Sequence, residues 1–440
     1  MDAARADAQA AAARAAARPE DHPDPRRWAV LALAVALFVC SQFYRVTNAV
    51  VAPELQADLR LSSEALGAVS AAFFYAFAVA QVPLALLLDR LGPRRIMAVL
   101  TVVGAAGAVV FAGAAGAAGA IAGRALLGLG MAGNLMGTLK LVASWFPGRR
   151  FATLAGVVLA VGTIGNVLAA TPLVLLVRAA GWRLSFVLVA VVTAAIAALF
   201  WLVVRDAPAR PPDGPAASAA AVEGPTSIRT SAALLLRSRE FWLISFGSFT
   251  RYGSFVAIQG LWIGPWLADV VGLGKVDAAN LILALNAGLV VGAPLGGWLS
   301  DHLLRSRKGV ALLCLGGVGA AELALALAGP SMGRWMLALV LAAFGVASSF
   351  SQVFYAHVKD VMPARMVGMA MTGTNFFVML GAATYLHAMG WLLDRTAAAG
   401  GARTAAGYET AFLIAGGTVL ASFLAYLGTR DARPAEGPRT

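Results

Sequence analysis

The feature of this sequence that most constrains its fold is a series of apolar runs, each close to the roughly 20 residues that cross a bilayer as a helix. The predicted spans are 28–50, 64–88, 96–117, 120–144, 151–177, 184–204, 241–267, 278–300, 309–328, 333–356, 367–393 and 409–428. The chain is 60% hydrophobic and 13% charged, whereas soluble domains are about 45–50% apolar and about 25% charged. The pattern predicts an all-α polytopic membrane protein with twelve transmembrane helices.

The basic residues are unevenly distributed about these spans. The net charge is +12, and most of the 34 Lys and Arg residues fall in the tails and loops on the side of the N-terminus. Cytoplasmic loops of membrane proteins carry such an excess. We therefore expect a multi-pass protein of the cytoplasmic (inner) membrane with both termini in the cytoplasm. Its basicity reflects orientation in the lipid bilayer, and no nucleic-acid partner is expected.

Composition also divides the chain into segments. Residues 1–27 form an Ala/Arg-rich tail without the features of a signal peptide. Residues 205–240 are rich in proline, glycine, alanine and serine and predict a flexible cytoplasmic linker. The linker separates a six-helix bundle at 28–204 from a second one at 241–428, and a short tail follows at 429–440.

Short motifs repeat at equivalent places in the two halves. LLLDRLGPRR at 86–95 follows the second span, and GWLSDHLLRSRK at 297–308 follows the eighth. WFPGRR and VMPARM follow the fourth and tenth spans, and FYR in the first span has FTR in the seventh. Two parallel six-helix halves with substrate bound near the midplane between them are a known transporter architecture.

The loop after the second span resembles the signature of the major facilitator superfamily, and the resemblance covers about 28–428. The matching residues are Leu87, Asp89, Arg90, Gly92, Arg94 and Arg95. The second copy keeps Gly297, Leu299 and Asp301, with Leu304 in place of the later glycine. The resemblance implies the twelve-helix fold of that family in two pseudo-symmetric bundles. It also implies a gating role for Asp89, Arg90, Gly92, Arg94 and Asp301, in which the aspartate faces helix N-termini and basic residues of the neighbouring bundle.

YRVTNAVVAPEL in the first span resembles the organic-anion branch of the family, which includes sialin and bacterial sugar-acid carriers. Arg45 and Asn48 approximate that branch's motif, in which the arginine contacts the substrate carboxylate. The chain departs from the branch at Tyr44 and at Met131, where the branch has acidic residues. We therefore expect weak dependence on a proton gradient, or exchange of one anion for another. More broadly, the sequence also resembles bacterial carriers of amino acids, small peptides or carboxylates.

Cationic residues inside the spans are the main candidates for substrate binding. Arg45 and Arg251 occupy equivalent places in the first and seventh spans, and two guanidinium forks across a central cavity would bind an anion. The alternative is that each arginine bonds backbone carbonyls of its own bundle. For Arg124, a binding role and a structural role are equally good interpretations. Lys140 is expected to reach the cytoplasmic interface.

Uncharged polar residues could complete the site. Those predicted to bind substrate, besides the arginines, are Tyr44, Asn48, Tyr252, Gln259 and Asn375; other candidates are Tyr75, Gln81, Asn134, Asn286, Gln352 and Tyr355. For each residue alone, a role as polar glue between helices is at least as good an interpretation. Glu322 in the ninth span is interpreted as a buried structural glutamate, and His357 and His387 as interfacial hydrogen-bonding residues.

Enzyme signatures are absent from the sequence. It contains no phosphate-binding P-loop, HExxH motif, Cys/His metal spacing or nucleophile elbow. We expect no enzymatic activity, no cofactor and no metal. The leading hypothesis is a monomeric secondary transporter of a small organic anion or zwitterion (a carboxylate, amino acid or small peptide) that works by alternating access. The alternatives are an exporter of drugs or metabolites, a non-transporting membrane sensor on a carrier fold, and an integral-membrane enzyme.

Overall fold

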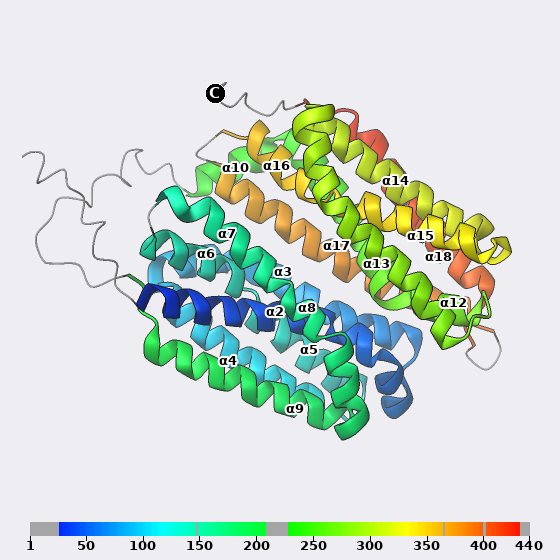
Figure 1. Cartoon of the computed structure of the whole chain (residues 1–440), viewed down its shortest axis with the longest axis horizontal. Helices are drawn as coiled ribbons and strands as arrows, with labels where there is room; N and C mark the ends of the chain where they lie inside the picture. The colour runs from blue at the N-terminus through cyan, green and yellow to red at the C-terminus, as the bar shows by residue number, and fades with distance from the viewer. Residues whose placement is uncertain (1–25, 147, 208–227, 364–365, 399–401, 432–440) are drawn as a thin grey trace, which may run out of the picture.

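The structure is a computed structural model that describes residues 26–146, 148–207, 228–363, 366–398 and 402–431 (Figure 1). In the N-terminal half the helices are α2 (Arg26–Leu59), α3 (Ser63–Leu91), α4 (Pro93–Ala112), α5 (Ala117–Met131), α6 (Asn134–Trp145), α7 (Gly148–Gly162), α8 (Ile164–Leu168) and α9 (Thr171–Val203). After α10 (Ile228–Arg237), the C-terminal half has α11 (Arg239–Ala257), the π-helix η1 (Ile258–Trp262), α12 (Ile263–Asp269), α13 (Lys275–Trp298), the π-helix η2 (Leu299–Leu303), α14 (Arg307–Ala328), the 3-10 turn η3 (Gly329–Ser331), α15 (Arg334–Ser349), α16 (Gln352–Val361), α17 (Val367–Arg395) and α18 (Ala405–Tyr426).

The predicted spans can be followed in these helices. Among the described residues, 10 segments are long and apolar enough to cross a membrane. One of them, Thr153–Val203, runs for 51 residues and holds both the fifth and the sixth predicted spans. Gly181 (φ 75°) interrupts the helix between these two spans. The seventh span is the run α11–η1–α12, which Arg251 and several hydroxyl-bearing residues make more polar than the others. The all-α prediction is confirmed.

The two halves share a bend that reflects their internal repeat. The fourth span is divided between α5 and α6 at 132–133, and the tenth between α15 and α16 at 350–351. α5 packs closely on its neighbour: a side chain at Gly128 of α5 would collide with the carbonyl of Phe73 on α3. Small residues let membrane helices approach closely without a hydrophobic driving force between them. α5 therefore packs directly on α3.

Helix starts at the membrane surfaces are fixed by local side chains. The hydroxyls of Ser62, Ser306 and Thr404 accept hydrogen bonds from the backbone N–H groups three residues on. Each hydroxyl satisfies one of the N–H groups that the first turn of a helix leaves unpaired. These caps explain why α3, α14 and α18 begin where polar loops give way to apolar runs.

The halves meet along α3 and α17, which lie side by side at their boundary (Figure 1). Gly67 of α3 crosses Gly390 of α17 so closely that a side chain on either would strike the other helix. At the same level the carboxylate of Asp394 accepts hydrogen bonds from the backbone N–H groups of Ser63 and Glu64, both at 2.8 Å. We call this end of the molecule, where α2 ends and α3 begins, the outer end, following the predicted orientation. The structure is therefore closed at the outer end.

The segment predicted as a flexible linker contains a helix at its C-terminal end. α10 packs against the C-terminal bundle, with Leu235 buried near Gly373 of α17. Of three consecutive leucines, Leu235 is buried in this contact, while Leu234 and Leu236, which point to other sides of the helix, are exposed. Residues 1–25 of the predicted N-terminal tail and 432–440 of the C-terminal tail lie outside the described residues, and Arg26 and Arg27 form the first turn of α2.

Candidate functional site

Arg45 projects from the middle of α2 and forms no hydrogen bond with any part of the protein that the structure describes. Its Nε is buried without a partner, while the residue as a whole is partly exposed. The guanidinium lies over the ring of Phe77 on α3, at 5.2 Å from the ring centroid. This cation–π contact is worth about 0.5–2 kcal/mol. It supports the arginine but leaves the hydrogen-bond donors of the fork available.

Arg251 lies on α11 and is more deeply buried, at 5% exposure. One of its terminal nitrogens donates to the carbonyl of Ser348 on α15 at 3.0 Å, and its Nε has no partner. Its guanidinium lies 5.2 Å from the centroid of the Tyr252 ring. The fork is therefore held on one side and retains donors on the other. The sequence alternative of an arginine bonded to carbonyls of its own bundle applies in part to Arg251 and not to Arg45.

Both arginines lie within electrostatic range of the Tyr355 side chain on α16: Arg45 from the N-terminal half, and Arg251, together with Tyr252, from the C-terminal half. The Tyr355 hydroxyl donates to the Asn375 side-chain oxygen on α17 at 3.0 Å. Arg45, Tyr252, Tyr355 and Asn375 are all partly exposed. We call these four residues and Arg251 the central cluster.

Three residues predicted for the site lie inside the N-terminal bundle instead. Arg124 is fully buried and donates to the backbone carbonyl of Tyr44 at 2.9 Å. The Tyr44 hydroxyl pairs with Thr193 of α9 at 3.2 Å, and the Asn48 side chain donates to Ser70 of α3. Of the two interpretations of Arg124, the geometry supports the structural one. All three side chains fix the packing of α2 against its neighbours.

Gln259 and Lys140 lie away from the central cluster's hydrogen bonds. Gln259, in η1, donates to the Asn286 side chain at 3.5 Å, a long contact within the C-terminal half. Lys140 donates to the carbonyl of Leu88 at the end of α3, at 2.7 Å. This placement agrees with the prediction that the ammonium reaches the membrane surface.

The loop motif after α3 makes its contacts within its own bundle. The backbone N–H of Arg94 donates to Asp206 at 2.7 Å, and the Arg94 guanidinium donates to the carbonyl of Trp201. Gly92 (φ 79°) passes so close to the Asp206 carboxylate that a side chain would collide with it. Arg90 is exposed in the last turn of α3. The side chain of Asp89 lies outside the described part of the structure, so its gating role stays a prediction.

The second copy of the motif is likewise paired within its own bundle. Arg307 binds Asp301 and also Asp360, the latter at 3.1 Å. Among the described side chains of the two copies, the contacts of Arg94, Asp301 and Arg307 stay within their own bundles, and the contact that the family resemblance implies for Asp89 stays a prediction. Among the described residues, the hydrogen bonds between the halves lie at the outer end, which is where a carrier closed to the outside would place them.

His357 is buried and fully hydrogen-bonded, as predicted. Its Nδ1 pairs with the Tyr426 hydroxyl at 2.6 Å and its Nε2 with the carbonyl of Arg430 at 2.8 Å. The carbonyl can only accept, so Nε2 carries the proton and Nδ1 accepts from Tyr426. His387 is partly buried on α17. Both histidines lie away from the central cluster's contacts.

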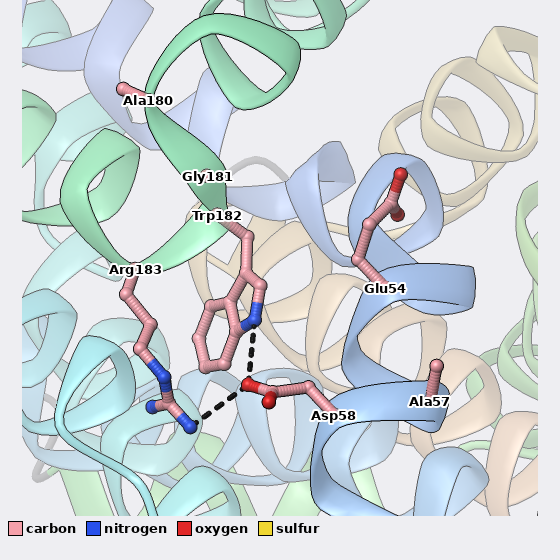
Figure 2. A pocket seen from close by; sticks show the side chains of 7 residues that line it. All are labelled: Glu54, Ala57, Asp58, Ala180, Gly181, Trp182 and Arg183. Carbon is pink, nitrogen blue, oxygen red and sulfur yellow. Dashed lines mark hydrogen bonds and ion pairs between the residues drawn. The ribbon is translucent and has the colours of Figure 1, made fainter.

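A shallow hollow of about 600 Å³ opens at the outer end of the N-terminal half and is lined by Glu54, Ala57, Asp58, Ala180, Gly181, Trp182 and Arg183 (Figure 2). Asp58 accepts from the Trp182 indole at 3.1 Å and pairs with Arg183 at 2.9 Å. Arg183 also donates to the carbonyls of Ala112 and Ala114. Because its donors are already paired, this hollow is a poorer anion site than the central cluster.

Sequence reasoning missed the residues that support the arginines and close the outer end. Phe77 under Arg45 is one of several phenylalanines in α3, and no local signal distinguishes it. Asp394 meets α3 across 331 residues of chain. The signal available in the sequence was an acidic residue, Asp394, at the end of one predicted span and a serine suited to cap a helix at the start of another.

Comparisons with known proteins agree with this architecture. The family model described as the Major Facilitator Superfamily matches residues 33–384. The hexuronate transporter of Bacillus subtilis is 26% identical over 413 residues, covering 89% of this chain and 92% of that protein. The probable sulfoacetate transporter of Cupriavidus necator is 26% identical over 298 residues, covering 66% of this chain and 69% of that protein.

Solved structures show the same fold. A bacterial homologue of the human lysosomal transporter Spinster, in an inward-facing and unoccupied conformation, superposes with a TM-score of 0.68 at 16% identity, covering 94% of this chain and 100% of that chain. The family match extends over most of the chain, so the prediction from the loop motif is confirmed. The chain belongs to the Major Facilitator Superfamily, whose members are multi-pass membrane transporters and not enzymes.

Proposed function

We propose that this protein carries a small organic anion, of the carboxylate or sulfonate class, across the inner membrane by alternating access between its two bundles. The observation that carries the proposal is Arg45, an intramembrane guanidinium with no hydrogen-bond acceptor among the described residues, within electrostatic range of Tyr355 in the opposite half. A cation in the middle of a membrane helix costs at least about 2.5–3.5 kcal/mol. An anionic substrate would offset that cost.

The composition of the central cluster favours an anion over a zwitterion. Arg45 and Arg251 supply positive charge and forked donors, and Tyr355 supplies a hydroxyl whose proton is directed to Asn375. Binding an amino group would require a nearby carboxylate open to the substrate. Glu322 on α14, a carboxyl group within a span, is fully buried and not open to the substrate. Amino acids and small peptides are therefore the second choice of substrate.

Similarity supports the same class. The relatives described above are named for a hexuronate and for sulfoacetate, and a further relative in Bacillus subtilis, 23% identical over 426 residues, is named as a probable galactarate/D-glucarate transporter. These substrates share one or two negative charges on a small polar frame. A site of two arginines, a tyrosine and an amide fits that description, because carboxylates and sulfonates accept from a guanidinium fork and hydroxyls bond Tyr and Asn.

The test is a binding screen on purified protein. We expect thermal stabilisation by one or more of D-glucuronate, D-glucarate, D-galactonate and sulfoacetate, and none by glucose or by neutral dipeptides. The hit should then exchange across proteoliposomes in a counterflow assay, with Arg178→Ala, an exposed arginine, as the control variant. Stabilisation by amino acids, dipeptides or hydrophobic cationic drugs, with none by the acids, would contradict the proposal.

A further inference from the structure

The start of the seventh span carries two exposed arginines that the central cluster does not use. Arg237 ends α10 and Arg239 begins α11, and neither forms a hydrogen bond or an ion pair with any residue in the described part of the chain. The Arg239 guanidinium lies beside Gly428, just after the end of α18, where a side chain on that glycine would collide with it. Arg239 therefore lies where the start of α11 meets the end of α18, at the end of the molecule opposite the outer end.

The acidic groups around these arginines are occupied by other groups. Glu240 accepts a hydrogen bond from the backbone N–H of Arg430 at 3.1 Å and lies 3.9 Å from the Nε of the same residue. Asp431 accepts from the backbone N–H of Lys308 at 3.2 Å. The Lys308 ammonium adds a further positive charge here, and it donates to two backbone carbonyls just after α18. The free donors of this region are therefore suited to an anion from outside the chain.

Exposed apolar side chains surround the two arginines. Leu236 on α10, Trp242 and Phe246 on α11, and Leu424 and Leu427 at the end of α18 are all exposed. The Trp242 indole donates to the carbonyl of Leu236 at 2.7 Å, which ties the end of α10 to the first turn of α11. We call these five apolar residues the interfacial patch. Because α11 and α18 are spans that pack on each other, their exposed apolar side chains lie against lipid.

This combination of side chains is typical of the level at which a bilayer meets water. Tryptophan is enriched at that level, where its ring lies among the lipid headgroups. A helix that is apolar on one side and basic on the other lies in the same plane, with its leucines at the acyl boundary. α10 fits this description, since Leu235 packs against the C-terminal bundle and Leu236 is exposed beside Arg237. A guanidinium fork pairs well with a phosphate group.

We propose that Arg237 and Arg239 bind the phosphate of an anionic phospholipid in the cytoplasmic leaflet, while the interfacial patch contacts its acyl chains. The bound lipid anchors α10, and with it the end of the linker that joins the two bundles, at the membrane surface. Arg239 lies 12 residues before Arg251, about 18 Å along the helix at 1.5 Å per residue. The lipid site is therefore distinct from the central cluster and does not depend on which substrate the protein carries.

The first test measures lipid binding to the purified full-length protein by native mass spectrometry. The probes are phosphatidylglycerol and phosphatidylcholine with the same acyl chains, and the wild type should bind the anionic lipid more tightly. A basic residue near an anionic lipid surface contributes about fivefold in affinity. Arg237→Gln and Arg239→Gln should therefore each weaken binding of phosphatidylglycerol by about fivefold and leave binding of phosphatidylcholine unchanged.

The matched control is Arg178→Gln, which removes an exposed arginine at the outer end and should keep the wild-type affinity for both lipids. Inorganic phosphate should not displace phosphatidylglycerol; if it does, the site takes free phosphate and the lipid assignment is wrong. Equal affinity of the wild type for the two lipids, or wild-type affinity in both arginine variants, would overturn the inference. So would an equal loss in the control, which would reduce the effect to net charge.

The second test asks whether α10 lies in the bilayer surface. Leu236→Cys, on a Cys40→Ser, Cys314→Ser background, carries a nitroxide in nanodiscs of mixed phosphatidylglycerol and phosphatidylcholine. The label should be relaxed more by oxygen, which partitions into lipid, than by a water-soluble nickel chelate. Lys359→Cys, at an exposed position in the last turn of α16, should show the reverse order. A Leu236 label open to the chelate, or one shielded from both reagents by a protein partner, would contradict the inference.

Discussion

Replacing Arg45 by alanine should weaken binding of the anionic substrate by about a hundredfold or more. The guanidinium lies over Phe77 and makes no hydrogen bond among the described residues, so the substrate supplies its acceptors. A unit charge at about 4 Å from the guanidinium gains about 4 kcal/mol at an effective dielectric constant near 20. Truncating one partner of a buried charged pair costs about 2–5 kcal/mol. Since about 1.4 kcal/mol is tenfold in affinity, a loss near 2.7 kcal/mol gives the hundredfold.

The contact with Phe77 does not enter this estimate. The variant loses the cation–π energy in both the free and the bound protein, so the contact affects stability and not affinity. Arg45→Lys keeps the charge and loses the planar fork, and it should therefore recover only part of the affinity. Isothermal titration of purified variants gives the dissociation constants, with Arg178→Ala as the charge-matched control. An Arg45→Ala variant that binds the wild-type ligand with wild-type affinity would refute the reasoning.

The remaining predictions concern Arg251 and the two ends of the molecule. Arg251→Lys should lower anion affinity by about tenfold, because the ammonium cannot hold the Ser348 carbonyl and the substrate in one plane; wild-type titration would argue against that geometry. Asp394→Ala removes the cap on α3, worth about 0.5–2 kcal/mol, and should raise labelling of reporter cysteines at the outer end. Gly390→Val should open the same end by steric conflict with α3, and unchanged labelling would mean that the helices separate elsewhere. Asp89→Asn should change flux and the labelling balance without loss of insertion, and wild-type values for both would make Asp89 a simple loop residue.

The sequence was sufficient to predict the spans and the division into two halves, because a bilayer imposes a length and an apolar composition on every helix that crosses it. It also singled out Arg45 and Arg251, since a charge inside an apolar run is conspicuous whatever its partners are. The seventh span shows the limit of this approach: its polar residues lower its hydropathy, yet it forms a continuous run of helix from Arg239 to Asp269.

The orientation of neighbouring side chains could not be predicted. Tyr44 and Arg45 are adjacent in α2, and successive helical residues point in different directions. The structure places Tyr44 inside the N-terminal bundle against Thr193 and leaves Arg45 partly exposed over the Phe77 ring. A sequence pattern that is apolar on every face of the helix does not indicate which polar residue points to the neighbouring bundle and which to the substrate.

Contacts between spans that are far apart in the sequence could not be predicted either. The hydrogen bond from Arg251 on α11 to the Ser348 carbonyl on α15 joins residues 97 positions apart and depends on how these helices pack. The cap of Asp394 on α3 likewise depends on how the two halves meet. Neither contact leaves a trace in local composition.

The most direct test of the anion site is an experimental structure of the protein with a bound anion identified by the screen. The account predicts that the carboxylate or sulfonate lies within hydrogen-bond distance of Arg45, with Arg251 or Tyr355 contacting the same molecule from the other half. An anion bound instead in the outer hollow beside Asp58, with the Arg45 guanidinium bonded only to protein groups of its own bundle, would contradict it.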